Sequence, residues 1–485
     1  PTTKNAEDAA DDLEISLAPT TPEASGDTAP APPAAETALG GFEIHGYLRA
    51  PLRVGVGPKN DRTSGTELHA PARVPDASFT DWRYLNTMPG PWSELFLSYG
   101  TPRATATISI AGYNQTIAGY RDLEAQLGIN QAFVTLQFPG TFGRYGDLSL
   151  TAGSFSDRYG IAGKHDAGMY QTYLFGRTKA VGETLSAKLS LTPQVALLIE
   201  HGIGAKLDVI PFDALNPRPD YLPYPGPVPQ GSTFLHHAHV GAEFGRHLLL
   251  TGHYLTAWTP DDHNAPGTTS EPGRISVVGG DAHVSAGAAG DGYVGFSHII
   301  AHHVLPVADA IEVLHSSGGY QLKNNFFGRF DPRTKLTPPD DSGRIESVLA
   351  QYALSLGKLV RYPARFSGNG SDLTLTVFGM YNVVRSDTFD HEMLKYGVDA
   401  LYSMFEVLAV GARFDTVNPD MASRRQSFSV LSPRIVLRTR FIARERVVLE
   451  YSHYFLGKEA YAAFPYNALP QADNNALMLS ASMAF

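Results

Sequence analysis

The stretch Asn475-Ala-Leu-Met-Leu-Ser-Ala-Ser-Met-Ala-Phe485 decides the fold of this chain. Every second residue back from Phe485 is apolar, namely Met483, Ala481, Leu479 and Leu477, whereas the positions between them are mostly small or polar. Side chains of a β-strand alternate between two faces, so this period of two predicts an amphipathic strand that runs to Phe485. An edge strand of a soluble sheet has the same pattern, so the interpretation depends on whether the pattern recurs.

The same alternation recurs along most of the chain. For example, Leu373, Leu375 and Val377 oppose Thr374 and Thr376. We predict eighteen strands, at 42–56, 91–100, 103–113, 129–138, 147–155, 173–190, 194–207, 232–245, 248–258, 274–286, 292–302, 343–356, 372–385, 394–404, 407–414, 427–442, 445–456 and 475–485.

The links between these strands alternate between short and long. Short links include 101–102, 192–194, 246–247, 288–291 and 443–445, and long ones include 57–90, 114–128, 208–231, 259–273, 303–342 and 457–474. Short turns at one rim and long loops at the other are typical of transmembrane β-barrels. An even number of strands then places both termini at the short-turn rim, which is the periplasmic one. The link at 357–371 is longer than its rim predicts.

Composition agrees with a barrel and excludes several other classes. The mean hydropathy of −0.14 and the absence of an apolar run of eighteen residues leave no candidate spanning helix. The chain has no cysteine, which excludes thiol catalysis, disulfides and thiolate metal sites. Its net charge of −10, without a basic stripe, argues against a nucleic-acid partner. The chain starts at Pro1 without a signal peptide, so we interpret it as a processed form.

Aromatic residues near the predicted strand ends favour a membrane barrel over a soluble sandwich. Tyr99, Tyr254, Trp258, Tyr352 and Tyr402 have the places of interfacial girdle residues. In hydrocarbon, an open sheet edge leaves backbone groups without partners, so the first and last strands must pair. We therefore predict an all-β fold, a transmembrane antiparallel up-and-down barrel of about eighteen strands over residues 41–485, with sixteen strands as the alternative.

Residues 1–40 differ from the rest of the chain. They contain Pro30-Ala-Pro-Pro-Ala34, many acidic residues and no aromatic residue. Such a composition buries no core, so we predict a disordered acidic arm.

Both ends of the predicted barrel resemble known outer-membrane proteins. The closing strand resembles that of Gram-negative outer-membrane barrels, which implies that Phe485 is the signal read by the barrel assembly machinery. The string His45-Gly46-Tyr47-x-Arg49 is similar to the opening strand of maltoporin-type sugar porins, which are eighteen-stranded trimers. That resemblance implies that Tyr47 stacks on sugar rings and that Arg49 hydrogen-bonds sugar hydroxyls. The chain departs from that family in having three Trp. Tyr47, Arg49 and Arg53 also line the pore by alternation alone.

The segment 156–170 is a candidate constriction. In trimeric porins the third long loop folds into the lumen, and this is the third long loop by our count. It holds Asp157, Arg158, Lys164 and Asp166, with glycines that allow tight turns. A solvated outer loop is the alternative.

A basic set late in the chain is predicted to face the lumen. It consists of Arg413, Arg434, Arg438 and Arg440, with Asp399, Asp415 and Glu450 as acidic partners on neighbouring strands. Such a ladder creates a transverse field in the pore, or else the charges pair and stiffen the wall.

The histidines give a weaker signal. His237 and His239 share one face of a predicted strand and could chelate a metal, but no carboxylate stands beside them in the sequence. We therefore predict no metal site and no cofactor.

The sequence favours a non-enzymatic outer-membrane porin, a passive channel for small hydrophilic solutes, with carbohydrates suggested by the resemblance. Expected partners are outer-membrane lipid and lipopolysaccharide, the assembly machinery and two further copies in a homotrimer. One alternative is a structural or adhesive barrel tethered through residues 1–40. Another is a barrel hydrolase, although neither a Gly-x-Ser-x-Gly elbow nor a phosphate-cradling glycine motif occurs.

Overall fold

The computed structural model of the chain describes residues 40–56, 92–113, 126–158, 164–167, 170–173, 176–207, 232–259, 273–302, 311–313, 342–360, 371–386, 390–404, 407–418, 421–422, 427–439, 444–456 and 475–485. The predicted arm, residues 1–40, lies outside this part of the chain except for Gly40.

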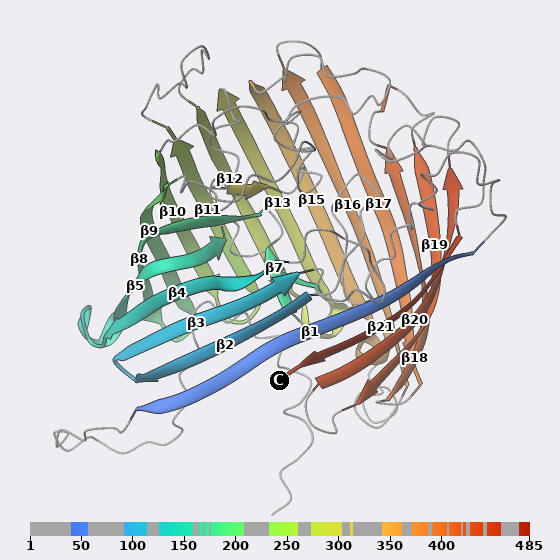
Figure 1. Cartoon of the computed structure of the whole chain (residues 1–485), viewed down its shortest axis with the longest axis horizontal. Coiled ribbons are helices and arrows are strands. Elements are labelled where there is room, and N and C mark those ends of the chain that lie inside the picture. The colour runs from blue at the N-terminus through green and yellow to red at the C-terminus, as the bar shows by residue number, and fades with distance from the viewer. Residues whose placement is uncertain are drawn as a thin grey trace, which may run out of the picture.

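Eighteen strands form one closed antiparallel barrel (Figure 1). They are β1 (Gly41–Val56), β2 (Trp92–Thr101), β3 (Ala104–Tyr113), β4 (Gln126–Phe138), β5 (Gly146–Arg158), β8 (Gly176–Thr192), β9 (Val195–Leu207), β10 (Ser232–Phe244), β11 (Leu248–Trp258), β12 (Arg274–Ser285), β13 (Asp291–His302), β15 (Gly343–Ser355), β16 (Asp372–Ser386), β17 (Asp390–Ser403), β18 (Leu408–Asn418), β19 (Phe428–Thr439), β20 (Arg444–Leu456) and β21 (Asn475–Ala484). Each pairs with the strand before and after it in this order, and β21 pairs with β1. The predicted fold class is confirmed, and the alternation located each of these strands to within a few residues.

The closure of the barrel brings the first and last strands together. The register runs from Tyr47 opposite Ala484 to Val56 opposite Asn475. Just beyond it, Gly46 N–H donates to the Phe485 carbonyl at 2.8 Å, and Phe485 N–H donates to the Gly46 carbonyl at 3.1 Å. A Cβ at Gly46 would lie 2.9 Å from the Phe485 ring and 2.7 Å from the Glu94 carbonyl oxygen. Only glycine at position 46 lets the terminal ring pack this closely over the seam.

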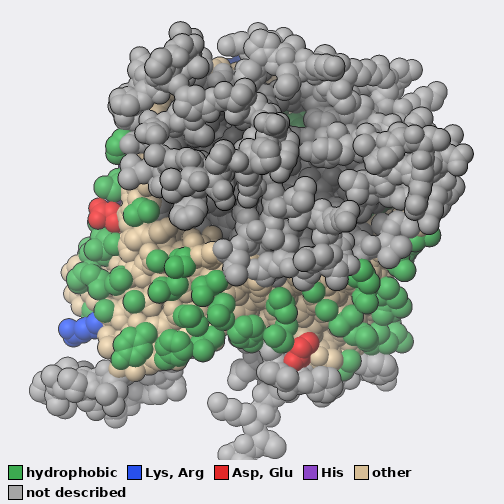
Figure 2. All heavy atoms as spheres, in the orientation of Figure 1, with side chains coloured by type: hydrophobic (Ala, Val, Ile, Leu, Met, Phe, Trp, Pro, Cys, Tyr) green, Lys and Arg blue, Asp and Glu red, His purple; other side chains and the backbone are tan. Residues whose placement is uncertain are grey.

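The outer face of the barrel is apolar. In β1, the exposed large hydrophobic side chains include Phe42, Ile44, Leu48 and Leu52. In β19 and β20, Leu431, Ile435, Leu437, Val447 and Leu449 are exposed in the same way. Figure 2 shows hydrophobic side chains spread over the outside of the strands with few charges among them. A soluble barrel would bury such a surface, so this face is suited to lipid.

Aromatic side chains ring both ends of this apolar surface. Beside the short turns, exposed aromatics are Phe42, Tyr99, Phe138, Phe244, Tyr352, Tyr402 and Phe485. At the opposite end, Phe234 stacks on Trp258, and Phe455 is exposed near the end of β20. Along β10, Phe234 and Phe244 are ten residues apart, which is about 34 Å along a strand and about 26 Å in height at a tilt near 40°. That height is close to the apolar band of about 25 Å in outer-membrane barrels.

The short connections have the local chemistry of tight turns. Between β4 and β5, Gly140 and Gly143 adopt φ of 71° and 63°, which favours glycine. The Asp147 carboxylate accepts the Gly140 N–H at 2.6 Å and the one-turn helix η2 (Gly143–Tyr145) completes the link. The short helices η4 (Gly287–Ala289) and α1 (Leu356–Leu359) follow β12 and β15. The Tyr352 hydroxyl donates to the Ala289 carbonyl, which ties an aromatic of the girdle to a short turn.

Three short strands were not predicted. β6 (Lys164–Ala167) and β7 (Tyr170–Tyr173) form a separate hairpin. β6 lies inside the predicted loop 156–170, and β7 begins at the last residue of that loop. β14 (Ile311–Val313), from the long connection between β13 and β15, pairs with Gly176–Thr178 of β8. Strands of three or four residues are too short to show an alternation. Among the described residues, no helix has the length and hydrophobicity needed to cross a membrane.

Candidate functional site

The inner face of the barrel carries buried polar and charged side chains. Along β1, Tyr47 is 1% and Arg49 is 8% exposed, whereas their outward neighbour Leu48 is 45% exposed. On β19 and β20, Arg434 and Glu450 are buried while Ile435 and Leu449 are exposed. The structure thus places Tyr47, Arg49, Arg434 and Glu450 on the face opposite to lipid, which is where the alternation predicted them.

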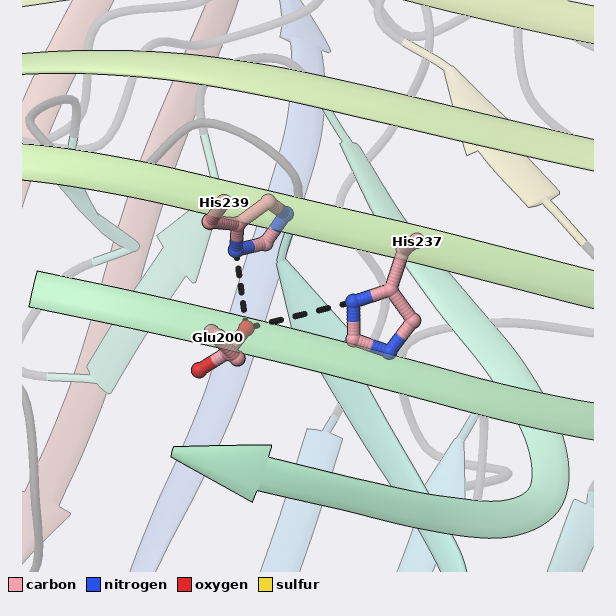
Figure 3. Close-up of side chains that lie close together, drawn as sticks. All are labelled: Glu200, His237 and His239. Carbon is pink, nitrogen blue, oxygen red and sulfur yellow. Dashed lines mark ion pairs between the residues drawn. The ribbon is translucent and has the colours of Figure 1, made fainter. Parts of the chain in front are cut away.

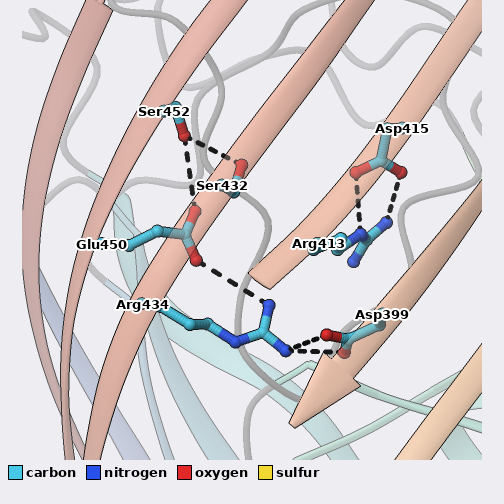
Figure 4. A network of polar contacts seen from close by, with 7 residues as sticks. All are labelled: Asp399, Arg413, Asp415, Ser432, Arg434, Glu450 and Ser452. Atoms are coloured by element: carbon cyan, nitrogen blue, oxygen red, sulfur yellow. Dashed lines mark hydrogen bonds and ion pairs between the residues drawn. The ribbon is translucent and has the colours of Figure 1, made fainter. Parts of the chain in front are cut away.

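A charged network occupies the inner face of β17–β20 (Figure 4). Arg434 Nη2 donates to the Asp399 carboxylate, at 2.6 Å from Oδ2, and Arg434 Nη1 lies 4.0 Å from Glu450 Oε2. Ser452 Oγ donates to Glu450 Oε1 at 3.4 Å and contacts Ser432 Oγ at 3.2 Å. Arg434 on β19 therefore reaches past β18 to a carboxylate on β17, so that one guanidinium links three strands, β17, β19 and β20.

A second pair lies beside this network on β18. The Arg413 guanidinium donates from Nε and Nη2 to the two carboxylate oxygens of Asp415, each at 2.8 Å. Its carbon lies 4.7 Å from the centre of the Phe378 ring on β16. Bidentate geometry and a ring face are the contacts that hold a buried guanidinium most firmly.

The same face has a surplus of positive charge. Arg438 and Arg446 are opposite each other in the register of β19 and β20, and Lys395 is buried on β17. We name the four arginines Arg413, Arg434, Arg438 and Arg446 the arginine wall. Among the described side chains of β17–β20, these four and Lys395 make five inward cations against the three carboxylates Asp399, Asp415 and Glu450. The described inner face of β17–β20 therefore carries a net charge of +2.

A cluster of histidines occupies the inner face of β9–β11. Glu200 on β9 is opposite His239 on β10, and His239 is opposite His253 on β11. His239 Nδ1 lies 2.8 Å and His237 Nδ1 3.9 Å from Glu200 Oε1 (Figure 3). We name Glu200, His237, His239 and His253 the histidine wall. All three histidines of the wall are buried.

The arginine wall and the histidine wall face each other across the barrel. β10 and β20 are separated by eight strands in either direction around the closed sheet. In a barrel of eighteen strands, that separation is half of the circumference. A net positive sector is therefore opposite a sector with the acid Glu200, and Glu243 lies further along β10 in an ion pair of 2.7 Å with Lys188.

The structure does not describe the side chains of several predicted pore residues. Arg53, Asp157 and Arg158 belong to the described backbones of β1 and β5, and Lys164 and Asp166 to that of β6. Their side chains, and Arg440 altogether, lie outside the described residues. Their role in the pore or a constriction stays a prediction.

Several acidic residues of the inner face were missed by the sequence analysis, among them Glu94, Glu200, Glu243 and Asp281. Glu94 on β2 is buried and accepts hydrogen bonds from Ser109 at 3.1 Å and Asn130 at 2.9 Å. Glu200 is on a predicted strand but is distant from His237 and His239 in sequence, and only the pairing of β9 with β10 brings them together. Aligning the predicted strands 194–207 and 232–245 as a hairpin would have found it.

Comparisons with known proteins find likeness in structure only. No protein-family model matches the chain, and no curated protein matches its sequence. Among solved structures, the outer membrane channel DcaP of Acinetobacter baumannii is 10% identical, with a TM-score of 0.40 over 93% of this chain and 99% of that chain. OpdK of Pseudomonas aeruginosa, solved with vanillate, is 9% identical, with a TM-score of 0.40 over 92% and 98%. OmpF of Salmonella typhi, in complex with daunomycin, is 11% identical, with a TM-score of 0.40 over 92% and 97%. Such low similarity transfers neither solute nor subunit arrangement to this chain.

Proposed function

We propose that this chain is a non-enzymatic porin of a Gram-negative-type outer membrane, a passive channel for small hydrophilic solutes. The observation that carries the proposal is the closed barrel with an apolar, aromatic-ringed outer face and a charged inner face. An apolar outer face with aromatic rings is expected only for a barrel that lies in a lipid bilayer. A barrel of eighteen strands is wide enough to enclose an aqueous passage.

The charges of the inner face suggest how solutes are selected. Cations and carboxylates on opposite walls create a field across the passage, which orients polar solutes and favours ions of one sign. The surplus on the arginine wall supports a preference for anions. Tyr47 and Arg49 lie on the inner face but are buried, so we propose them as residues that shape the passage rather than as open solute contacts. Carbohydrates are the suggested class of solute, and Arg53, Asp157, Arg158, Lys164, Asp166 and Arg440 are proposed as further pore residues.

The proposal extends to orientation and assembly. Both ends of the described barrel, Gly41 and Phe485, lie beside the short turns, which supports placing both termini in the periplasm. We further propose outer-membrane lipid and lipopolysaccharide as surroundings, recognition of Phe485 by the assembly machinery, and a homotrimer in which the small exposed residues Ala104, Ala106 and Ala481 allow close contact. Residues 1–40 are proposed as an arm outside the pore.

Single-channel recording in planar lipid bilayers tests the function. The purified chain should give discrete ohmic conductance steps, and sugars added to the bath should reduce the current if they enter the passage. Removing residues 1–40 should leave the conductance of each channel unchanged. A folded barrel that inserts but conducts no ions would favour the structural or adhesive alternative.

A further inference from the structure

We propose that Glu200, His237 and His239 form a binding site for a divalent first-row transition-metal ion on the inner wall of the barrel. The two histidines come from alternate positions of β10 and the carboxylate from the adjacent strand β9 (Figure 3). This inference departs from the expectation of no metal site, which rested on the absence of a carboxylate near the histidines in sequence. It stands on side-chain geometry and does not depend on the channel function.

The distances between the three side chains suit a metal ion. Their ligand atoms all lie within 4.8 Å of one another, and Glu200 Oε1 is 2.8 Å from one Nδ1 and 3.9 Å from the other. Metal–ligand bonds of about 2.0–2.1 Å in a tetrahedron place ligand atoms about 3.3 Å apart. The observed distances bracket this value, so small side-chain rotations bring all three atoms onto one ion. Within the part of the chain that the structure describes, no other group of three such ligands is this close.

The neighbouring strand β8 orients two of the ligands. Thr184 Oγ1 lies 3.3 Å from His237 Nε2, which leaves the Nδ1 of that ring toward Glu200. Ser186 Oγ donates to Glu200 Oε2 at 3.2 Å, the oxygen that does not face the histidines. Such outer contacts fix the orientation of metal ligands in characterised sites.

A glycine opposite His237 makes room for this arrangement. Gly202 pairs with His237 in the register of β9 and β10, and a Cβ at Gly202 would lie 2.0 Å from His237 Nε2. The imidazole can lie against the wall only because position 202 has no side chain. The ring is thereby held beside Glu200 and His239, with which its Nδ1 forms the cluster.

The chemistry of the ligands indicates the class of ion. Two imidazoles and one carboxylate are the ligand set of many zinc sites, and imidazole also suits copper, nickel and iron. Magnesium and calcium prefer sites made of oxygen ligands. Three protein ligands leave at least one coordination position for water or a solute. Binding of a divalent ion would also change the charge of this wall from negative to positive if Glu200 is ionised.

Calorimetric titration of the full chain in detergent with Zn²⁺ tests the site, after treatment with a chelator and its removal. We expect one Zn²⁺ bound per chain and no comparable binding of Mg²⁺. Glu200→Gln preserves the shape of the side chain and should weaken Zn²⁺ binding at least tenfold. The double variant His237→Ala/His239→Ala should abolish it. Circular dichroism and the gel mobility of unheated samples check that each variant is folded.

The outer face of the same strands supplies a matched control. His201 and His236 lie on β9 and β10 with their Nε2 atoms 3.0 Å apart, but on the opposite face of the sheet. The variant His201→Ala/His236→Ala should leave the proposed site unchanged. If that variant loses Zn²⁺ binding, or if folded Glu200→Gln and His237→Ala/His239→Ala variants bind as the unaltered chain does, the proposal is wrong.

Discussion

The sheet at β9–β10 and the sheet at β19–β20 obey the same alternation but use it differently. Inside, β19–β20 carry the ion pair of Arg434 with Glu450, and Arg434 also pairs with Asp399 on β17, whereas β9–β10 carry imidazoles around the Glu200 carboxylate. Outside, β19–β20 present aliphatic side chains at Ile435 and Leu449. On the same face, β9–β10 present a histidine pair, His201 and His236, close to the aromatic side chains at the end of the barrel opposite the short turns. The difference shows that alternation determines whether a side chain points inward or outward. The residues on adjacent strands determine which contacts that side chain makes, and so its chemical role.

The largest loss of stability should come from removing one partner of a buried polar contact on the inner face of each sector. Arg434→Met removes the guanidinium that Asp399 and Glu450 share, and loss of one partner from a buried pair typically costs about 3–5 kcal/mol. His239→Leu removes one contact to Glu200 and should cost about 1–3 kcal/mol. Unfolding in urea of the barrel in lipid vesicles measures both. Equal losses in the free energy of unfolding would show that the ion pairs of β19–β20 stabilise the barrel no more than the contact of His239 with Glu200 does.

On the outer face, the cost of a new charge should depend on depth. Ile435 is near the middle of β19, so Ile435→Arg should destabilise the membrane-inserted barrel by about 2–4 kcal/mol and lower its assembled yield. His236 lies two residues from the aromatic Phe234, so His236→Arg should cost about 0–1 kcal/mol. The readout is the yield of folded barrel in the outer membrane, with total synthesis as the control. A severe defect at position 236 would show that the apolar band extends further than the aromatic ring indicates.

Ion selectivity should move in opposite directions when single charges are removed from opposite walls. Arg438→Ala removes an inward cation, and we expect the reversal potential in a salt gradient to shift by a few millivolts toward cations. Glu243→Gln on β10 removes an inward anion and should shift it toward anions. Recordings are made with a chelator present, so that bound metal does not contribute. Shifts in the same direction would refute the assignment of the two walls.

The smallest perturbation tests the alternation that both sectors share. Single cysteines at positions 437 and 438 leave the charge of the outer face unchanged, and no native cysteine interferes. A water-soluble thiol reagent should label position 438 and spare position 437 in membranes. Labelling of 437 alone would invert the two faces of β19, and with them every inward residue named on that strand.

The sequence predicted which strands exist and which way their residues face, because a period of two fixes both within one strand. It predicted the positions of Tyr47, Arg434 and Glu450 on the inner face for this reason. It did not predict the pairing of Arg434 with Asp399, two strands away, or of His239 with Glu200. These contacts depend on the stagger between strands, which is set by turn geometry and closure and leaves no mark in any single strand. β14 was missed because three residues carry no periodic signal.

The seam between Gly46 and Phe485 has a consequence for how the chain folds. Its two hydrogen bonds join residues that are 485 − 46 = 439 positions apart, whereas every other strand pair of the barrel is between consecutive barrel strands. A contact between residues so far apart in sequence forms more slowly than a hairpin does. One edge of β1 therefore stays unpaired until β21 pairs with it, and an unpaired strand edge can form hydrogen bonds with other chains. To avoid aggregation during biogenesis, the edge of β1 must stay shielded until it pairs with β21. The close packing of Phe485 over Gly46 then helps to hold the two strands together.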